Sequence, residues 1–189
     1  MPKKRAAALF LVTVSVCLAQ EKGPAKLILK VDEQVTGPLG GQRSSSCLRL
    51  YSDGTALYAS WWNEGIATID ETGKQSHPEH TVSVEHRLDR GDLWELSNFL
   101  ESKPVNKLAT KFPPPHPPVD YIEDISVQFA GKKGVTRQTS TREFYVADLE
   151  EKSRYPSALI VLMDRIDQIE REANEKGKPA PIPADCRLK

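Results

Sequence analysis

Residues 47–62, CLRLYSDGTALYASWW, decide the fold, because they hold two β-prone runs on either side of a short turn. Leu48 and Leu50 alternate with Arg49 and Tyr51, which is the period of a strand with one buried face. The turn contains Asp53-Gly54, and glycine supplies the positive φ that such turns need without steric cost. The stretch therefore predicts a β-hairpin and, with it, a largely antiparallel sheet.

Further strands are expected on both sides of this hairpin. Four more ranges show β-prone composition or alternation, and they are 27–35, 81–88, 121–129 and 135–146. The last is polar and threonine-rich, which suits an edge strand with one wet side. Residues 36–46 and 63–79 are rich in loop-forming residues and predict loops, the second with a short strand near 66–69. A sheet of about five to six strands follows.

Two amphipathic helices are expected. One begins at Asp89 or Asp92 and is stopped by Pro104, with Leu93, Leu96 and Leu100 at helical spacing. The other has Pro156 at its first position and Gly177 as its C-terminal cap. Its apolar stripe consists of Tyr155, Leu159, Leu162, Ile166, Ile169 and Ala173. Each helix has a single apolar stripe, so both are expected to pack on one face of the sheet in an α+β fold.

The first 19 residues have the pattern of a secretory signal peptide. Lys3, Lys4 and Arg5 precede an apolar run that is too short to span a bilayer, and Cys17-Leu18-Ala19 is a plausible cleavage site. The alternative is a retained signal anchor. We expect a flexible mature N-terminus at 20–26, one domain at 27–177 and a proline-rich tail at 178–189. The location is then periplasmic or extracellular.

Cleavage after residue 19 would leave two cysteines, Cys47 and Cys186. Thiols oxidise outside the cytoplasm, so a disulfide between them is the natural prediction. The alternative is a pair of free thiols, because Cys186 lies in a tail that could be loose.

The charge of the chain argues against a nucleic-acid partner. Basic and acidic residues number 26 each, and cleavage would remove three bases and no acids, for a formal charge of −3. Nucleic-acid binding needs a basic face. No further apolar run is long enough for a membrane helix. We expect no cofactor, and a protein or peptide is the partner class that remains open.

Three histidines are the best candidates for metal binding. His77, His80 and His86 form H-x2-H-x5-H, and imidazole binds Zn²⁺ or Cu²⁺. The spacing differs from H-E-x-x-H, which places both histidines on one helical face. The alternative interpretation is a solvated pair plus one core-facing histidine that bonds a neighbour. His116 lies among prolines at 113–118, where an extended spacer is expected.

Trp61 and Trp62 are neighbours on a predicted strand and should point to opposite faces of the sheet. One is expected in the core. The other is either covered by the loop at 63–79 or exposed as an aromatic anchor for a peptide or sugar.

The hairpin, the following helix (LWELSNFLES), the strand DYIEDISVQF and the closing helix (YPSALIVLMDRIDQI) resemble a loose group of bacterial exported domains of unknown function. These share a strand-SDG-strand hairpin and this order of elements, and the resemblance covers about residues 46–172. It implies an exported α+β domain and assigns no activity or site residue.

The sequence leads to three functional hypotheses. The first is an exported, non-catalytic domain that binds or scaffolds something outside the cytoplasm. It rests on the signal pattern and on the lack of a nucleophile motif such as G-x-S-x-G. The second is a metal-binding protein or metal-dependent enzyme that uses the three histidines. The third is an inhibitor-like or peptide-binding module that presents a tryptophan or the sheet edge at 135–146.

Overall fold

The computed structural model describes residues 25–37, 43–64, 68–69, 71–73, 75–114, 122–145 and 147–188. The predicted signal peptide, most of the predicted flexible N-terminus and His116 lie outside these ranges.

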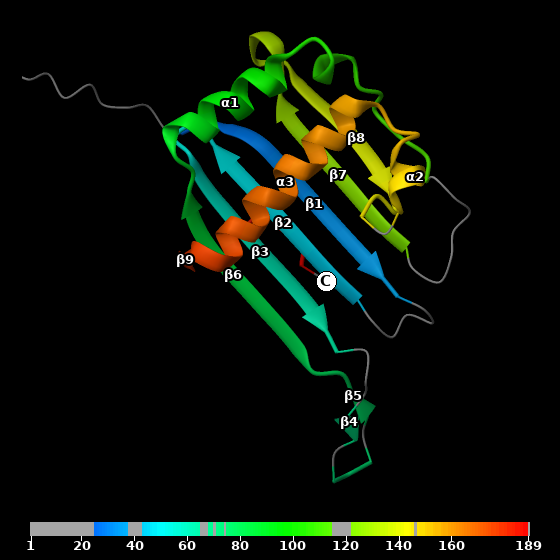
Figure 1. The fold of residues 1–189 in the computed structure, drawn as a ribbon. Coiled ribbons are helices and arrows are strands. Elements are labelled where there is room, and N and C mark those ends of the chain that lie inside the picture. Colours follow the sequence, from blue (N-terminus) through cyan, green and yellow to red (C-terminus); the bar gives the residue numbers. More distant parts are fainter. Residues whose placement is uncertain are drawn as a thin grey trace, which may run out of the picture.

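One antiparallel sheet organises the described residues (Figure 1). It contains seven strands in the order β8-β7-β1-β2-β3-β6-β9. Their bounds are β1 Leu27–Thr36, β2 Arg43–Tyr51, β3 Thr55–Asn63, β6 Glu79–Arg87, β7 Ile122–Ala130, β8 Thr136–Arg142 and β9 Lys178–Pro179. A separate two-stranded ribbon pairs β4 (Thr68–Ile69) with β5 (Gln75–Ser76).

The prediction of five to six strands was too low. The additional strand is β9, in the tail, which pairs with Val84 and Glu85 at the edge of β6. Pro179 is compatible with an edge, where its missing N–H costs no ladder hydrogen bond. The predicted loop at 36–46 is also too long, because β2 begins at Arg43 and its three serines form part of the ladder.

The predicted hairpin is confirmed. β2 and β3 pair in register around a turn in which Gly54 has a φ of 90°. Glycine is required here for two reasons. It adopts this positive φ without strain, and a Cβ added at Gly54 would lie only 3.1 Å from the carbonyl oxygen of Leu88.

Both predicted long helices are present, and a short one precedes the second. Helix α1 covers Arg90–Glu101, and Asp89 is its N-cap, accepting a hydrogen bond from the backbone N–H of Asp92. Helix α2 covers Leu149–Lys152 behind a capping box of Asp148 and Glu151. Helix α3 covers Ser157–Lys176, with Pro156 as its N-cap and Gly177 as its C-cap. Two short 3-10 turns, η2 (Val105–Lys107) and η3 (Lys132–Gly134), complete the helical elements.

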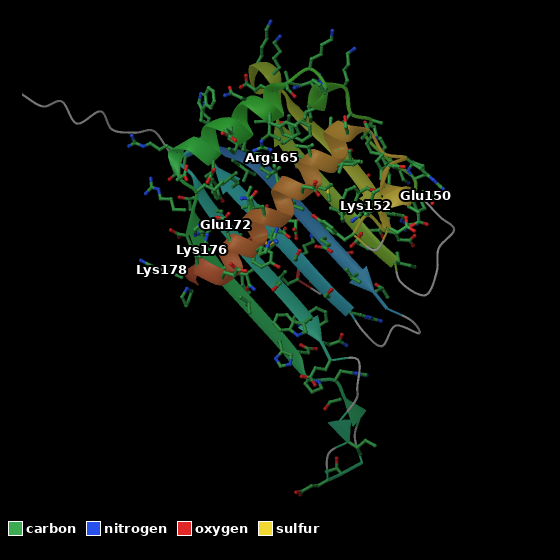
Figure 2. All side chains as sticks on the ribbon, in the orientation of Figure 1. Glu150, Lys152, Arg165, Glu172, Lys176 and Lys178 are labelled. Carbon is green, nitrogen blue, oxygen red and sulfur yellow. A yellow bond between two sulfur atoms is a disulfide. The ribbon has the colours of Figure 1, made fainter. Side chains whose placement is uncertain are left out.

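Helix α3 has one buried stripe and one charged surface. Every residue of the predicted stripe is buried. Figure 2 shows Glu172 and Lys176 along the helix, and their side chains pair at 3.5 Å, while Asp167 and Arg171 pair at 3.1 Å. These i,i+4 pairs support the exposed side of the helix.

Helix α3 lies in front of the sheet in Figure 1, and we call the face that it crosses the helix side. The strand pairing places the residues that face the helix side in rows that run across the sheet from strand to strand. One row is Phe129, Leu29, Leu50 and Ala56, and the next is Val127, Val31, Leu48, Tyr58 and Val84. Apart from Val84, these rows join Leu96 and Leu100 of α1 and the α3 stripe as far as Ile169 in a single core cluster. They form the core because burial of apolar surface drives the packing of helix on sheet.

The edge expected at 135–146 is partly covered. Ser140 of β8 exchanges backbone hydrogen bonds with Thr110 and Phe112, at 2.9 and 2.8 Å. The hydroxyl of Thr139 also donates to the carbonyl of Ala109 at 2.8 Å. The middle of β8 is therefore protected from the addition of another strand.

The tail crosses the face of the sheet opposite the helices. We call residues 180–188 the strap and this face the strap side. Cys186 of the strap is disulfide-bonded to Cys47 of β2, with Cα atoms 5.9 Å apart. None of the described helices is long and apolar enough to cross a membrane.

Candidate functional site

Beyond the core, the residues on the helix side of the sheet become more polar and more exposed. The row after Val31 and Leu48 contains Ile125, Glu33, Ser46, Ser60 and Val82. The last row contains Glu123, Val35, Ser44, Trp62 and His80. Most of these side chains are half-buried or exposed, whereas most of those in the core rows are buried. Figure 1 shows why: α3 crosses the sheet obliquely and leaves this end of the strands uncovered.

We call this region the acidic platform. It consists of Glu33, Ser44, Ser46, Ser60, Trp62, His80 and Glu123 on the strands, and Asp167 and Glu170 on α3.

Glu33 and Glu170 bring carboxylates together at the centre of the platform. Glu33 accepts a hydrogen bond from the hydroxyl of Ser46 at 3.0 Å. Burial raises the pKa of Glu33, the hydrogen bond from Ser46 lowers it, and the charge of Asp167 raises it again, for a net increase. Burial also raises the pKa of Glu170 to about 8, with further increases from Glu33 and Asp167.

Glu170 is incompletely satisfied. Its Oε1 atom has almost no accessible surface and no hydrogen-bond partner among the described residues. A buried oxygen without a donor is costly, because folding removes its water and returns nothing. The charges that act on this carboxylate are those of other carboxylates, so it lacks the cation that usually accompanies such a group.

Glu123 stands at one end of the platform and has a structural role. Its Oε2 atom accepts a hydrogen bond from the backbone N–H of Tyr145 at 2.9 Å, which fixes the turn after β8. Burial raises the pKa of Glu123 to about 7, partly offset by that hydrogen bond, and the charge of Glu33 raises it further. The platform thus contains carboxyl groups that titrate close to neutral pH.

An aromatic pair stands at the other end. Trp62 is 38% exposed and stacks on His80, with ring centroids 5.3 Å apart and planes 21° from parallel. Glu64 fixes the position of His80, because its Oε1 lies 3.0 Å from Nε2 of the imidazole. Trp62 therefore presents a fixed indole surface, which is suited to packing against an alkyl chain or a cation.

Trp61, the neighbour of Trp62, points to the strap side. Its indole is 7% exposed, and its N–H donates to Glu79 at 3.4 Å. The two adjacent tryptophans thus lie on opposite faces, as strand geometry requires. Trp62 is the one that is available as an aromatic anchor.

The three histidines do not converge. Nδ1 of His77 lies 3.0 Å from the backbone oxygen of Glu64, close to His80 in the same region. His86 is six residues further along β6, roughly 20 Å away at the rise of a strand. It lies 3.8 Å from Glu172 of α3 beside a small cavity of about 40 Å³. Among the described residues no three His, Cys, Asp or Glu side chains come together in a way that could hold a metal ion.

The platform was missed in the sequence because its residues come from six separate elements. Glu33, Glu123 and Glu170 each look like ordinary solvated carboxylates in their own segments. The available signal was the run of serines at 44–46, which now alternate between the two faces, with Ser44 and Ser46 on the platform and Ser45 buried opposite. Comparison of the chain with protein-family models and with curated proteins finds no match.

Proposed function

We propose that this protein is an exported, non-catalytic binding domain, and that the acidic platform holds the ammonium or guanidinium group of a basic peptide. The observation that carries the proposal is the group of Glu33, Asp167 and Glu170, in which the charges that raise the pKa of Glu33 and of Glu170 are those of the other carboxylates. A guanidinium or ammonium group bound over Glu33 would supply the missing positive charge.

The rest of the platform fits the same ligand. The indole of Trp62 offers a face for the alkyl stem or the cation of a Lys or Arg side chain. The hydroxyls of Ser44 and Ser60 lie between the aromatic and acidic ends. The Cys47–Cys186 disulfide is consistent with an exported protein. The proposal also retains the expectation that α1 and α3 share one face, which leaves the platform open beside α3.

Calorimetry with a short peptide tests this proposal. An acetylated, amidated Gly-Arg-Gly-Arg peptide should bind the full chain at pH 8, and Gly-Gln-Gly-Gln should not. Glu33→Gln should weaken binding at least about tenfold, because a charge-assisted hydrogen bond contributes about 1.5–3 kcal/mol. Glu101→Gln, on the exposed end of α1, is the matched control and should leave the affinity unchanged.

The pH dependence gives a second readout. Affinity should increase from pH 6 to pH 8.5, because Glu123 and Glu170 lose their protons over this range and become acceptors for a cation. Equal affinity for the arginine and glutamine peptides, or equal binding by wild type and Glu33→Gln, would remove the basis of the proposal.

A further inference from the structure

The strap side contains a second polar site, built around a buried arginine. Arg49 lies on β2 between Leu48 and Leu50 but points to the opposite face, where it is fully buried. All of its donors are used. Nη1 donates to the carbonyls of Val31 at 2.7 Å and Leu48 at 3.0 Å. Nη2 donates to Asp32 at 2.6 Å and to the backbone oxygen of Asp185 at 3.3 Å.

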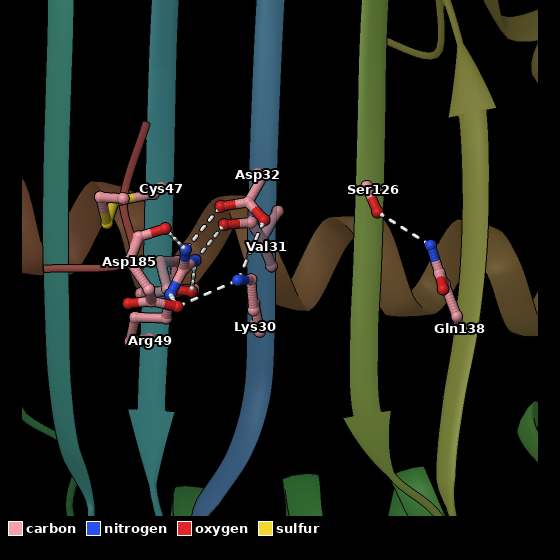
Figure 3. Close-up of polar contacts among 10 residues, drawn as sticks. Lys30, Val31, Asp32, Cys47, Arg49, Ser126, Gln138 and Asp185 are labelled. Carbon is pink, nitrogen blue, oxygen red and sulfur yellow. Dashed lines mark hydrogen bonds and ion pairs between the residues drawn. A yellow bond between two sulfur atoms is a disulfide. The ribbon is translucent and has the colours of Figure 1, made fainter. Parts of the chain in front are cut away.

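The strap provides the remaining partner. Asp185 places one carboxylate oxygen 2.9 Å from Nε of Arg49 and 2.9 Å from Nζ of Lys30 (Figure 3). Burial raises the pKa of Asp185, but the hydrogen bonds and charges of Lys30 and Arg49 outweigh this and bring it below its usual value. The cation pair formed by Lys30 and Arg49 therefore recognises a carboxylate, and the chain's own tail occupies it.

Besides the disulfide, the hydrogen bonds that Asp185 accepts from Lys30 and Arg49 are the main contacts of the strap with the sheet. Ala180 donates to the backbone of Ser83 at 3.0 Å, and Cys186 donates only within the strap, to Pro183. The side chain of Asp185 is 53% exposed, and ion pairs with such an exposed partner contribute little. Without the strap, Arg49 would keep its hydrogen bonds to Val31, Leu48 and Asp32, so release would not leave a buried charge without a partner.

The strap also forms one wall of a groove of about 830 Å³ on this face. Its floor is made by polar residues of β1, β7 and β8, and Ala184, Asp185 and Arg187 of the strap close it on one side. Lys30 of the cation pair lines the same groove, so a peptide that took the place of the strap could contact Lys30 and the groove together.

We propose that Lys30 and Arg49 form a binding site for the carboxylate of an acidic peptide, and that the disulfide-held strap blocks it until a dithiol reductant opens the Cys47–Cys186 bond. This site is separate from the acidic platform. While the disulfide is closed, Asp185 is held at the cation pair at a high effective concentration. When it is open, an external acidic segment competes for the same two cations.

The chemistry is thiol–disulfide exchange. A thiolate of the dithiol attacks Sγ of Cys186, which is more exposed than Cys47, and the Sγ of Cys47 leaves as a thiolate and takes up a proton. The second thiol of the reductant then displaces Cys186 from the mixed disulfide. Two electrons and two protons pass to the cysteine pair, and the reductant becomes a cyclic disulfide.

A labelled peptide with the strap sequence, APIPADSRL, tests the site in trans on the full chain carrying Asp185→Asn. Asp185→Asn weakens the protein's own strap as a competitor of the added peptide. The serine in the peptide stands in the place of Cys186. Fluorescence anisotropy should show at least tenfold tighter binding after reduction with dithiothreitol than before it. Lys30→Gln in the same background should reduce binding at least threefold, and Lys26→Gln, on an exposed lysine at the start of the same segment, should not.

Hydrogen exchange on wild type separates release of the strap from unfolding. After reduction, the hydrogen-bonded amides of Ala180 and Cys186 should lose protection while those of β2 and β3 keep it. A strap that stays protected, or peptide binding that is equal before and after reduction, would overturn the proposal. Peptide binding that is unaffected by Lys30→Gln would do the same.

Discussion

A variant with Cys47→Ala and Cys186→Ser is expected to lose about 2–5 kcal/mol of unfolding free energy. The bridge spans 139 residues of sequence, so it restricts almost the whole unfolded chain. The entropic model gives about 5 kcal/mol for such a loop as an upper value. Equilibrium urea denaturation of oxidised wild type and of the variant measures the difference directly.

The reduced wild type is the control for this experiment. Its urea midpoint should fall to that of the variant, because both lack the same constraint. Agreement between oxidised wild type and the variant to within about 1 kcal/mol would mean that the bridge adds little, and that the strap is held by its other contacts.

The second large effect is expected at Glu170. A folded-state pKa of about 8, against a usual value of 4.5, means that the folded protein keeps a proton that the unfolded chain releases. The stability linked to this group is complete below pH 4.5 and is lost as pH rises through about 8. Wild type should therefore become less stable between pH 5 and pH 8.5.

Replacement of Glu170 by Gln removes this dependence, because an amide does not ionise. One pKa unit corresponds to about 1.4 kcal/mol, so the variant should exceed wild type by about 1–4 kcal/mol at pH 8.5. At pH 5 the two proteins should be nearly equal. Glu175→Gln, on the exposed end of the same helix, is the matched control and should follow wild type at both pH values. Parallel stability curves for wild type and Glu170→Gln would show that Glu170 ionises normally.

The fold was largely predictable because its signals are local. The Asp53-Gly54 turn, the Asp89 cap and the stripe of α3 each depend on residues that are close in sequence. The strand β9 was missed because two residues, one of them a proline, carry no periodicity of their own. The start of β2 was missed because serine in isolation favours turns. Here the pairing with β3 determines the extended conformation of these residues.

The two sites could not be predicted in the same way as the fold, because they depend on strand register and on contacts between distant segments. The expectation of export, with two cysteines left after the expected cleavage, was enough to predict the Cys47–Cys186 bond. Nothing near Arg49 in the sequence indicates that Asp185, 136 residues later, would bind it. In the same way, Glu33 and Glu170 become neighbours only when α3 crosses the sheet. Long-range electrostatic partners of this kind have no periodic signature.

The most direct test of the acidic platform is carbon-detected NMR titration of the Glu side-chain carboxyl groups between pH 4 and pH 9, with and without the arginine peptide. Without peptide, the carboxyl carbon of Glu170 should titrate near pH 8 and that of Glu123 near pH 7. With saturating peptide both midpoints should fall by at least about one pH unit, because a bound cation favours the charged forms. Midpoints near 4.5 without peptide, or midpoints that the peptide leaves unchanged, would contradict the assignment of this surface as a site for cations.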